Sequence, residues 1–223
     1  MNLGEQRKKK RLVVAGSAAN PVSRAHRDLA EMLTHSGHFD RVLWVPSGIR
    51  HDKPNLIDST HRVRMTELAF DDAWKAEQPT PFAIDLREAF QKSIPTIYLL
   101  EEIKGEYPDH EIVFATGVDV LEPREHLGGR CEVHSWDEGE RLMQNWTFAV
   151  LPRDGYADPA VLQEEGKLPA HFIVLPPTQK DTGYISSTEI RRRAAAGLPI
   201  EHLVHPSVAD YIKAHNLYQG DRR

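Results

Sequence analysis

The chain has 223 residues, of which 40% are hydrophobic and 27% are charged, a profile typical of one α/β domain. The formal net charge of −5 argues against nucleic acid as a partner, since no overall positive charge offsets the repulsion from phosphates. The single cysteine, Cys131, excludes an internal disulfide and a Cys-rich zinc site, and it fits a reducing, cytoplasmic compartment. No apolar run approaches the ~20 residues of a membrane span, so we expect no membrane partner.

Strand and helix signals alternate along the chain. Short apolar runs predict six strands, at residues 12–15, 42–45, 82–86, 111–115, 147–151 and 172–175. Apolar residues at helical spacing predict helices that begin near Ser23 and then at residues 58–73, 95–103, 136–143, 158–165, from 185 onward, and 205–218. The polar stretch at residues 123–132 is expected to be a loop or an insertion. We find no internal repeat.

This alternation predicts parallel strands joined by helical crossovers. The fold class is therefore α/β: a doubly wound, Rossmann-like, mostly parallel sheet flanked by helices, with a C-terminal helical segment. We expect a basic N-terminal arm at residues 1–10 and a single domain at 11–223, whose C-terminal helical part covers about 185–218.

Residues that can bind phosphate or sugar follow four of the predicted strands. In chain order these are Gly16 and Ser17, the loop 48–53 with His51 and Lys53, Gly117 and Asp119, and Arg153. Ligands of such sheets bind at the carboxyl edge, near the point where the strand order reverses. We therefore expect these four strand ends to converge on one rim.

The first strand, turn and helix, residues 11–31, offer a phosphate site at the start of the helix. His26, one turn into this helix, is the candidate catalytic group, although a surface histidine would fit the same pattern. Ser23 could donate its hydroxyl to a phosphate or cap the helix, and we slightly favour the cap. The turn is not a Walker loop, because no Gly-Lys-Ser/Thr follows it, and the Gly-x-Gly-x-x-Gly spacing is absent.

Several motifs resemble a known family, in order and from about residue 11 to about residue 218. The first, GSAANPVSRAH at residues 16–26, is similar to a glycine-rich turn followed by an Asn/Asp-Pro pair and a histidine pair, and the last is ISSTEIR at residues 185–191. Between them lie Gly117-Val118-Asp119, Ser135-Trp136-Asp137-Glu138 and Pro152-Arg153-Asp154-Gly155-Tyr156. The set resembles nicotinate or nicotinamide mononucleotide adenylyltransferases, of the HxGH-type nucleotidyltransferase superfamily.

The resemblance implies an enzyme that joins the AMP moiety of ATP to nicotinate or nicotinamide mononucleotide and releases pyrophosphate, in NAD biosynthesis. It implies Mg²⁺ bound through the ATP phosphates, with no metal site of the protein's own. His26 would be catalytic. ATP and its phosphates would be bound by Gly16, Ser17, Ser23, Lys53, Gly117, Asp119, Ser186, Ser187, Thr188 and Arg191. The pyridine mononucleotide would be bound by Thr96, Trp136 and Arg153.

Two departures keep other functions open. Ser23 replaces the first histidine of the pair, and Ala18-Ala19 stand where one residue is usual. A catalytically silent nucleotide-binding or regulatory homologue, or a transferase with another phosphorylated acceptor, therefore remains an alternative.

Several motif residues also have purely structural interpretations. Asp119 could cap a short helix, Trp136 could pack in the core, and Ser186 with Glu189 could form a capping box. The sequence leaves the preference between acid and amide substrates open, and also the oligomeric state, including a homo-oligomer.

Overall fold

The computed structural model describes residues 9–50, 53, 55–177, 182 and 185–219, so His51 lies outside the described residues. Its centre is one six-stranded sheet in the order β3-β2-β1-β4-β5-β6, and every neighbouring pair is parallel. The strands are β1 (Lys10–Ser17), β2 (Arg41–Pro46), β3 (Phe82–Ile84), β4 (His110–Gly117), β5 (Thr147–Leu151) and β6 (His171–Val174). The doubly wound parallel sheet is thus confirmed, and its strand order reverses between β1 and β4.

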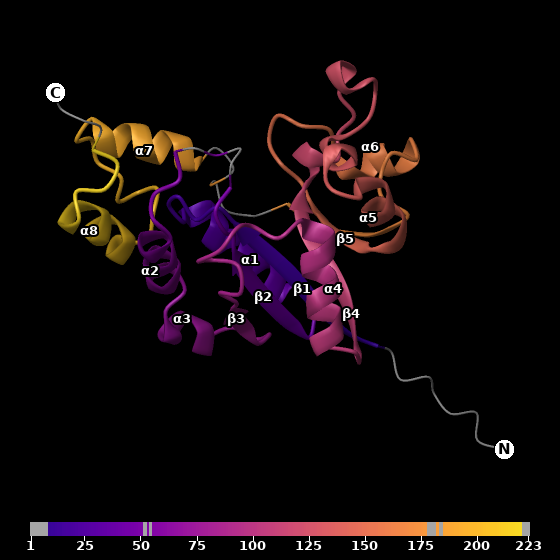
Figure 1. The fold of residues 1–223 in the computed structure, drawn as a ribbon, viewed down its shortest axis with the longest axis horizontal. Coiled ribbons are helices and arrows are strands. Elements are labelled where there is room, and N and C mark those ends of the chain that lie inside the picture. Colours follow the sequence, from indigo (N-terminus) through magenta and orange to yellow (C-terminus); the bar gives the residue numbers. More distant parts are fainter. Residues whose placement is uncertain (1–8, 51–52, 54, 178–181, 183–184, 220–223) are drawn as a thin grey trace.

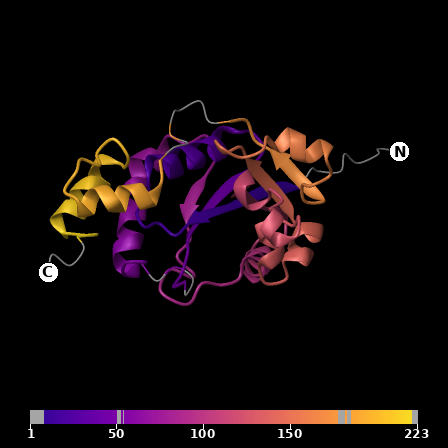
Figure 2. The same ribbon diagram turned by 90° about the horizontal axis from the view of Figure 1, so that it is seen from above.

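Helices connect the strands and end the described chain. They are α1 (Arg24–His35), α2 (Ser59–Ala69), α3 (Asp72–Ala76), α4 (Thr96–Glu106), α5 (Gly139–Asn145), α6 (Pro159–Glu164), α7 (Ser187–Ala195) and α8 (Pro206–Ala214). In Figures 1 and 2, α7 and α8 lie at one end of the molecule, and α5 and α6 lie at the other. No helix in the described ranges combines the length and apolar character that a membrane crossing requires.

The strands are apolar throughout because both faces of the sheet are covered. Side chains alternate between the faces along a strand, so Val13 and Ala15 of β1 join one hydrophobic cluster while Leu12 and Val14 join another. The first cluster includes residues of α1, α2, α3, α7 and α8, and the second those of α4, α5 and α6. This explains why apolar residues follow one another without interruption along each strand and do not alternate with polar ones.

Two predicted helices differ from the observed ones. The predicted helix at 58–73 is two helices, because Phe70 ends α2 with φ −120° and ψ 61° and the Asp71 carboxylate caps α3, accepting from Trp74 N–H at 2.8 Å. The predicted helix at 136–143 begins only at Gly139, since Trp136 and Glu138 form a turn in front of it. Trp136 therefore lies outside any helix.

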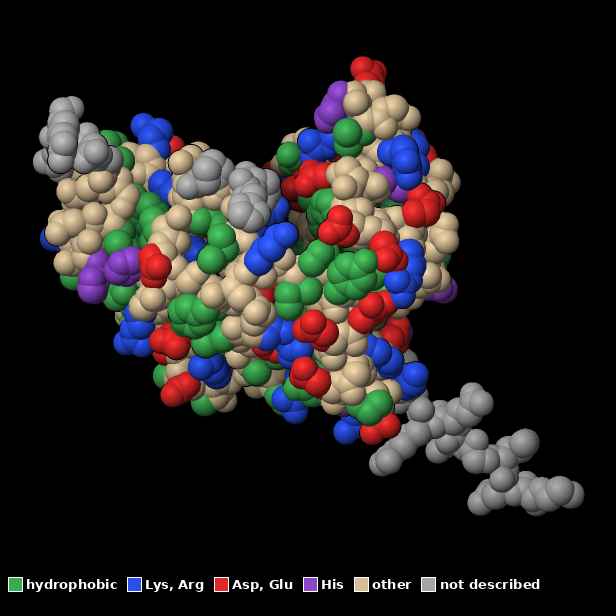
Figure 3. All heavy atoms as spheres, viewed as in Figure 1, with side chains coloured by type: hydrophobic (Ala, Val, Ile, Leu, Met, Phe, Trp, Pro, Cys, Tyr) green, Lys and Arg blue, Asp and Glu red, His purple; other side chains and the backbone are tan. Residues whose placement is uncertain are grey.

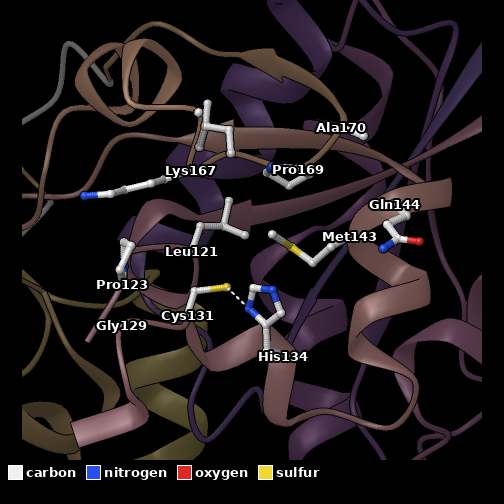
Figure 4. Close-up of a pocket in the computed structure, with 12 residues that line it drawn as sticks. Leu121, Pro123, Gly129, Cys131, His134, Met143, Gln144, Lys167, Pro169 and Ala170 are labelled. Carbon is white, nitrogen blue, oxygen red and sulfur yellow. Dashed lines mark hydrogen bonds between the residues drawn. The ribbon is translucent and has the colours of Figure 1, made fainter. Parts of the chain in front are cut away.

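The stretch at residues 123–132 is a loop with a short 3₁₀ turn, Glu125–Leu127. Its two ends meet in an antiparallel bridge between Arg124 and Arg130, and Arg124 Nη2 donates to the Asp119 carbonyl at 2.8 Å. Beneath the loop is a pocket of about 250 Å³, where the Cys131 sulfur lies 3.0 Å from Nδ1 of His134 (Figure 4). Residues 123–132 are thus held against the residues that follow the end of β4.

Candidate functional site

The predicted rim exists at the carboxyl ends of β1, β2, β4 and β5. Ser17 and Pro46 are in register, and Ser47 N–H donates to the Ser17 carbonyl at 2.9 Å. Gly117 is likewise in register with Leu151, so the loops after β4 and β5 emerge side by side. Figure 3 shows the surface hollowed between the end that carries α7 and α8 and the raised loop around residues 124–130.

Close backbone approach explains the glycine at the end of β1. A Cβ on Gly16 would lie 2.1 Å from the carbonyl oxygen of Val45 on the neighbouring strand. Beyond it, the turn is held by the Ser17 hydroxyl, which accepts from Ala19 N–H at 3.1 Å. Ala19 is buried and takes a left-handed conformation with φ 52°, so the additional turn residue is accommodated inside the fold.

His26 is oriented by Ser23, the residue that replaces the first histidine of the motif pair. Ser23 is the N-cap of α1, which confirms the favoured interpretation, and its hydroxyl accepts from His26 N–H at 3.4 Å. The Ser23 backbone N–H donates to Nδ1 of His26 at 3.0 Å, and Ser23 Oγ lies 2.8 Å from the same nitrogen. A neutral ring that accepts at Nδ1 carries its proton on Nε2.

The surroundings of His26 favour the neutral imidazole. Burial, followed by the positive charges of Arg153 and Lys53, lowers the pKa of His26 from 6.5 to about 4. The ring also meets Trp44 edge-on, with 6.1 Å between ring centroids. At neutral pH His26 is therefore an N–H donor and not a cation.

Asp119 and Arg153 form an ion pair across the ends of β4 and β5, with 2.7 Å between Oδ2 and Nη1. The Asp119 side chain is largely buried and that of Arg153 is half-exposed. Gly117, and not Asp119, is the N-cap of the 3₁₀ turn Val118–Val120, so the helix-cap interpretation of Asp119 is wrong.

The last motif packs on the first. Arg191 Nη1 donates to the Asn20 carbonyl at 2.8 Å, and the Ser187 hydroxyl donates to the Pro21 carbonyl at 2.9 Å. The Tyr218 hydroxyl donates to Asn20 Oδ1 at 3.1 Å, and burial raises the pKa of Tyr218. Arg191 and Ser187, at the start of α7, therefore stand beside the turn that leads to His26.

Only half of the predicted capping box of α7 is present. Ser186 is the N-cap and accepts from Glu189 N–H at 3.2 Å. The Glu189 carboxylate instead pairs with Arg192 at 2.7 Å, because the guanidinium one turn further along offers two donors. Arg191 Nη2 also contacts Thr188 Oγ1 at 3.2 Å.

A buried arginine that the sequence did not single out supports two of the strand ends. Arg62 of α2 is 1% exposed and donates to the carbonyls of Ala18 at 3.0 Å and Ser47 at 2.6 Å. It also donates to Ser59 Oγ at 2.9 Å. A sequence signal existed, because Arg62 shares the helical spacing of the buried residues of α2, Val63, Met65, Thr66 and Ala69.

A buried carboxylate supports the other side of the same loop. Glu88 is 3% exposed and accepts from the backbone N–H groups of Gly48 at 3.1 Å and Ile94 at 2.9 Å. The Ser93 hydroxyl donates to it at 3.1 Å. Glu88 thus ties the loop after β2 to the segment that leads into α4, and no local pattern in the sequence distinguishes it from an exposed glutamate.

The remaining predicted residues lie on the loops around the rim. Lys53 is exposed in the loop after β2, and its charge reaches His26. Thr96 is the first residue of α4. Trp136 is partly buried and meets Phe114 of β4 edge-on at 6.2 Å between ring centroids, so packing explains part of its environment.

A family model described as cytidylyltransferase-like matches residues 14–193, which include every strand end of the rim. The chain belongs to the cytidylyltransferase-like family. It is a nucleotidyltransferase.

Relatives within this family match almost the whole chain. A protein of Thermoanaerobacter sp. (strain X514) is 30% identical, with 95% of this chain and 95% of its own length covered. Another, of Carboxydothermus hydrogenoformans, is 29% identical, with coverage of 92% and 96%. Both bear the name "Probable nicotinate-nucleotide adenylyltransferase".

Solved structures of other proteins share the fold of this chain. The nicotinic acid mononucleotide adenylyltransferase of Plasmodium falciparum, complexed with NaAD, has a TM-score of 0.78 at 23% identity, with 96% of this chain and 100% of that chain covered. The same enzyme complexed with APC has a TM-score of 0.76 at 21% identity and the same coverage. The nucleotidyltransferase fold therefore extends over nearly the full length.

Proposed function

We propose that the protein transfers the AMP moiety of ATP to nicotinate mononucleotide and releases pyrophosphate, a step of NAD biosynthesis. The observation that carries this proposal is the neutral His26 imidazole, held by Ser23 at the start of α1, the helix that follows β1 where the strand order of the sheet reverses. The shared name of the relatives supports nicotinate over nicotinamide as the acceptor base.

In the proposed reaction an oxygen of the mononucleotide phosphate attacks the α-phosphorus of ATP. A new bond joins that oxygen to phosphorus, and the bond between the α-phosphorus and the bridging oxygen to the β-phosphate breaks. The electron pair leaves with pyrophosphate. The protein forms no covalent bond, so its work is to align the two phosphates and to stabilise the charge that develops between them.

His26 serves this reaction as a hydrogen-bond donor. With Nδ1 occupied by the Ser23 N–H, the Nε2–H can donate to an α-phosphoryl oxygen. A serine suffices at position 23 because its backbone N–H and hydroxyl both lie within 3.0 Å of Nδ1. The missing first histidine is therefore compatible with catalysis in this proposal.

The other predicted residues keep their proposed roles on the two substrates. Gly16, Ser17, Ser23, Lys53, Gly117, Asp119, Ser186, Ser187, Thr188 and Arg191 would contact ATP, and Thr96, Trp136 and Arg153 the pyridine mononucleotide. Mg²⁺ would arrive on the ATP phosphates and neutralise part of their charge. The cytoplasmic location stays a prediction.

Pyrophosphate release with ATP and Mg²⁺ tests the proposal, with nicotinate and nicotinamide mononucleotides compared side by side. We expect turnover with both or with nicotinate alone, with the larger kcat/KM for nicotinate. His26→Ala should lower kcat at least 100-fold while ATP binding by calorimetry changes little. If the native protein binds ATP but releases no pyrophosphate with either acceptor, the alternative of a catalytically silent nucleotide-binding homologue would be supported instead.

A further inference from the structure

A bridge of side chains on the surface joins α4 to the turn that carries Trp136. The Tyr98 hydroxyl donates to Glu138 Oε1 at 2.8 Å. The other carboxylate oxygen accepts from Arg141 Nη1 at 2.6 Å, and Arg141 also pairs with Glu101 of α4. Two contacts therefore connect α4 to the start of α5.

Glu138 and Trp136 lie on one short turn. Glu138 is the N-cap of α5 in a left-handed conformation, with φ 49° and ψ 34°, which residues other than glycine rarely adopt. Trp136 N–H donates to the Val133 carbonyl at 3.0 Å, and Gly139 N–H donates to the Trp136 carbonyl at 2.9 Å. Only one residue separates Trp136 from Glu138, so the bridge is anchored on the same short turn that carries the indole.

The bridge also begins close to Thr96, another of the three residues predicted for the pyridine mononucleotide. Thr96 opens α4, and Tyr98 follows it on the first turn of the same helix. The hydrogen bond from Tyr98 to Glu138 thus links the turn that carries Trp136 to the helix start that carries Thr96. We propose that Tyr98 and Glu138 are positioning residues for the pyridine mononucleotide, an inference that rests on the proposed function.

A purely structural role is a poor explanation of this bridge. The Tyr98 residue and the Glu138 side chain are each 40% exposed, and ion pairs at such sites contribute little to stability. The turn is already closed by backbone hydrogen bonds, and Gly139 packs so closely on η3 (Glu132–Ser135) that a Cβ there would lie 1.9 Å from the Val133 carbonyl. The turn is therefore closed without the bridge. What the bridge adds is a link between this turn and α4.

Two variants separate positioning from stability. Tyr98→Phe removes the donor and keeps the ring. Glu138→Gly removes the carboxylate and puts at φ 49° the residue that tolerates it best, so thermal stability should be kept or raised. Glu140→Gln is the matched control, because it breaks another exposed pair of α5, with Arg130 at 2.8 Å.

In the pyrophosphate assay, Tyr98→Phe and Glu138→Gly should each raise the KM for nicotinate mononucleotide roughly 5-fold, the effect of one charged hydrogen bond at a half-exposed site. The KM for ATP and kcat should stay within about twofold, and the control should match the native protein. An unchanged mononucleotide KM in both variants, or equal losses for both substrates, would overturn the proposal while leaving the proposed function intact. Silence of the native protein with nicotinate mononucleotide would overturn both.

Discussion

The depressed pKa of His26 makes a quantitative prediction about acid stability. The unfolded chain binds a proton at His26 near the ordinary value of 6.5, whereas the folded protein binds it only near pH 4. Between these values the unfolded state holds more protons, so the free energy of unfolding decreases as the pH falls. His26 should therefore destabilise the folded protein by about 2.5 kcal/mol at pH 4.5 and by only about 0.2 kcal/mol at pH 7.

Urea unfolding of the native protein and of His26→Gln measures this difference. Glutamine does not titrate, and its amide oxygen can still accept from the Ser23 N–H. The difference in unfolding free energy between the two proteins should change by about 2 kcal/mol from pH 7 to pH 4.5, in favour of the variant. Acidic residues titrate in both proteins and cancel in the comparison.

A pH-independent difference between the two proteins would refute the assigned pKa, and with it the neutral donor role. A direct check is the NMR titration of the His26 ring protons, whose midpoint should lie near 4 rather than 6.5. A midpoint at the ordinary value would mean that His26 is half-cationic near pH 6.5 and could act as a charge on the phosphates.

Three further perturbations test other parts of the rim. Gly16→Ala places a Cβ 2.1 Å from a backbone oxygen and should cost about 3 kcal/mol in urea unfolding, whereas Gly105→Ala in α4, which meets no neighbour, should stabilise by about 0.5 kcal/mol. Glu88→Gln leaves one of two buried backbone N–H donors facing an amide NH₂, so its unfolding free energy should fall by about 2 kcal/mol. Arg153→Gln removes a charge that lowers the pKa of His26, so the NMR midpoint should rise; an unmoved midpoint would exclude Arg153 and leave burial and Lys53 as the causes.

The sheet could be predicted from sequence because burial on both faces leaves a strong local signal. The predicted strand at 147–151 matches β5 at both ends, and the run at 172–175 differs from β6 by one residue. The positions of the strand ends then predict the rim, because the carboxyl ends of parallel strands lie at the same edge of the sheet. The convergence of Gly16, Gly117 and Arg153 required no knowledge of side-chain contacts.

Residues that act through long-range burial could not be predicted in this way. Arg62 reaches the Ser47 carbonyl across 15 residues, and Glu88 reaches Gly48 across 40. The helical spacing of Arg62 indicates that it is buried, but no period or neighbour pattern in the sequence reveals the partner of either residue. The segment that begins at Trp136 has helical composition, but the left-handed Glu138 and the backbone hydrogen bonds of the turn keep Trp136 outside α5.

The contacts between the first and last motifs bear on how the protein is made. Arg191 reaches Asn20 across 171 residues of sequence, and Tyr218 reaches the same residue across 198. On the ribosome the strand and turn of residues 10–21 emerge early, yet they stay without these partners until residues 191 and 218 have been synthesised. A stalled or truncated chain that ends before α7 would lack both contacts, so nucleotide binding should appear only after α7 and residue 218 have been made.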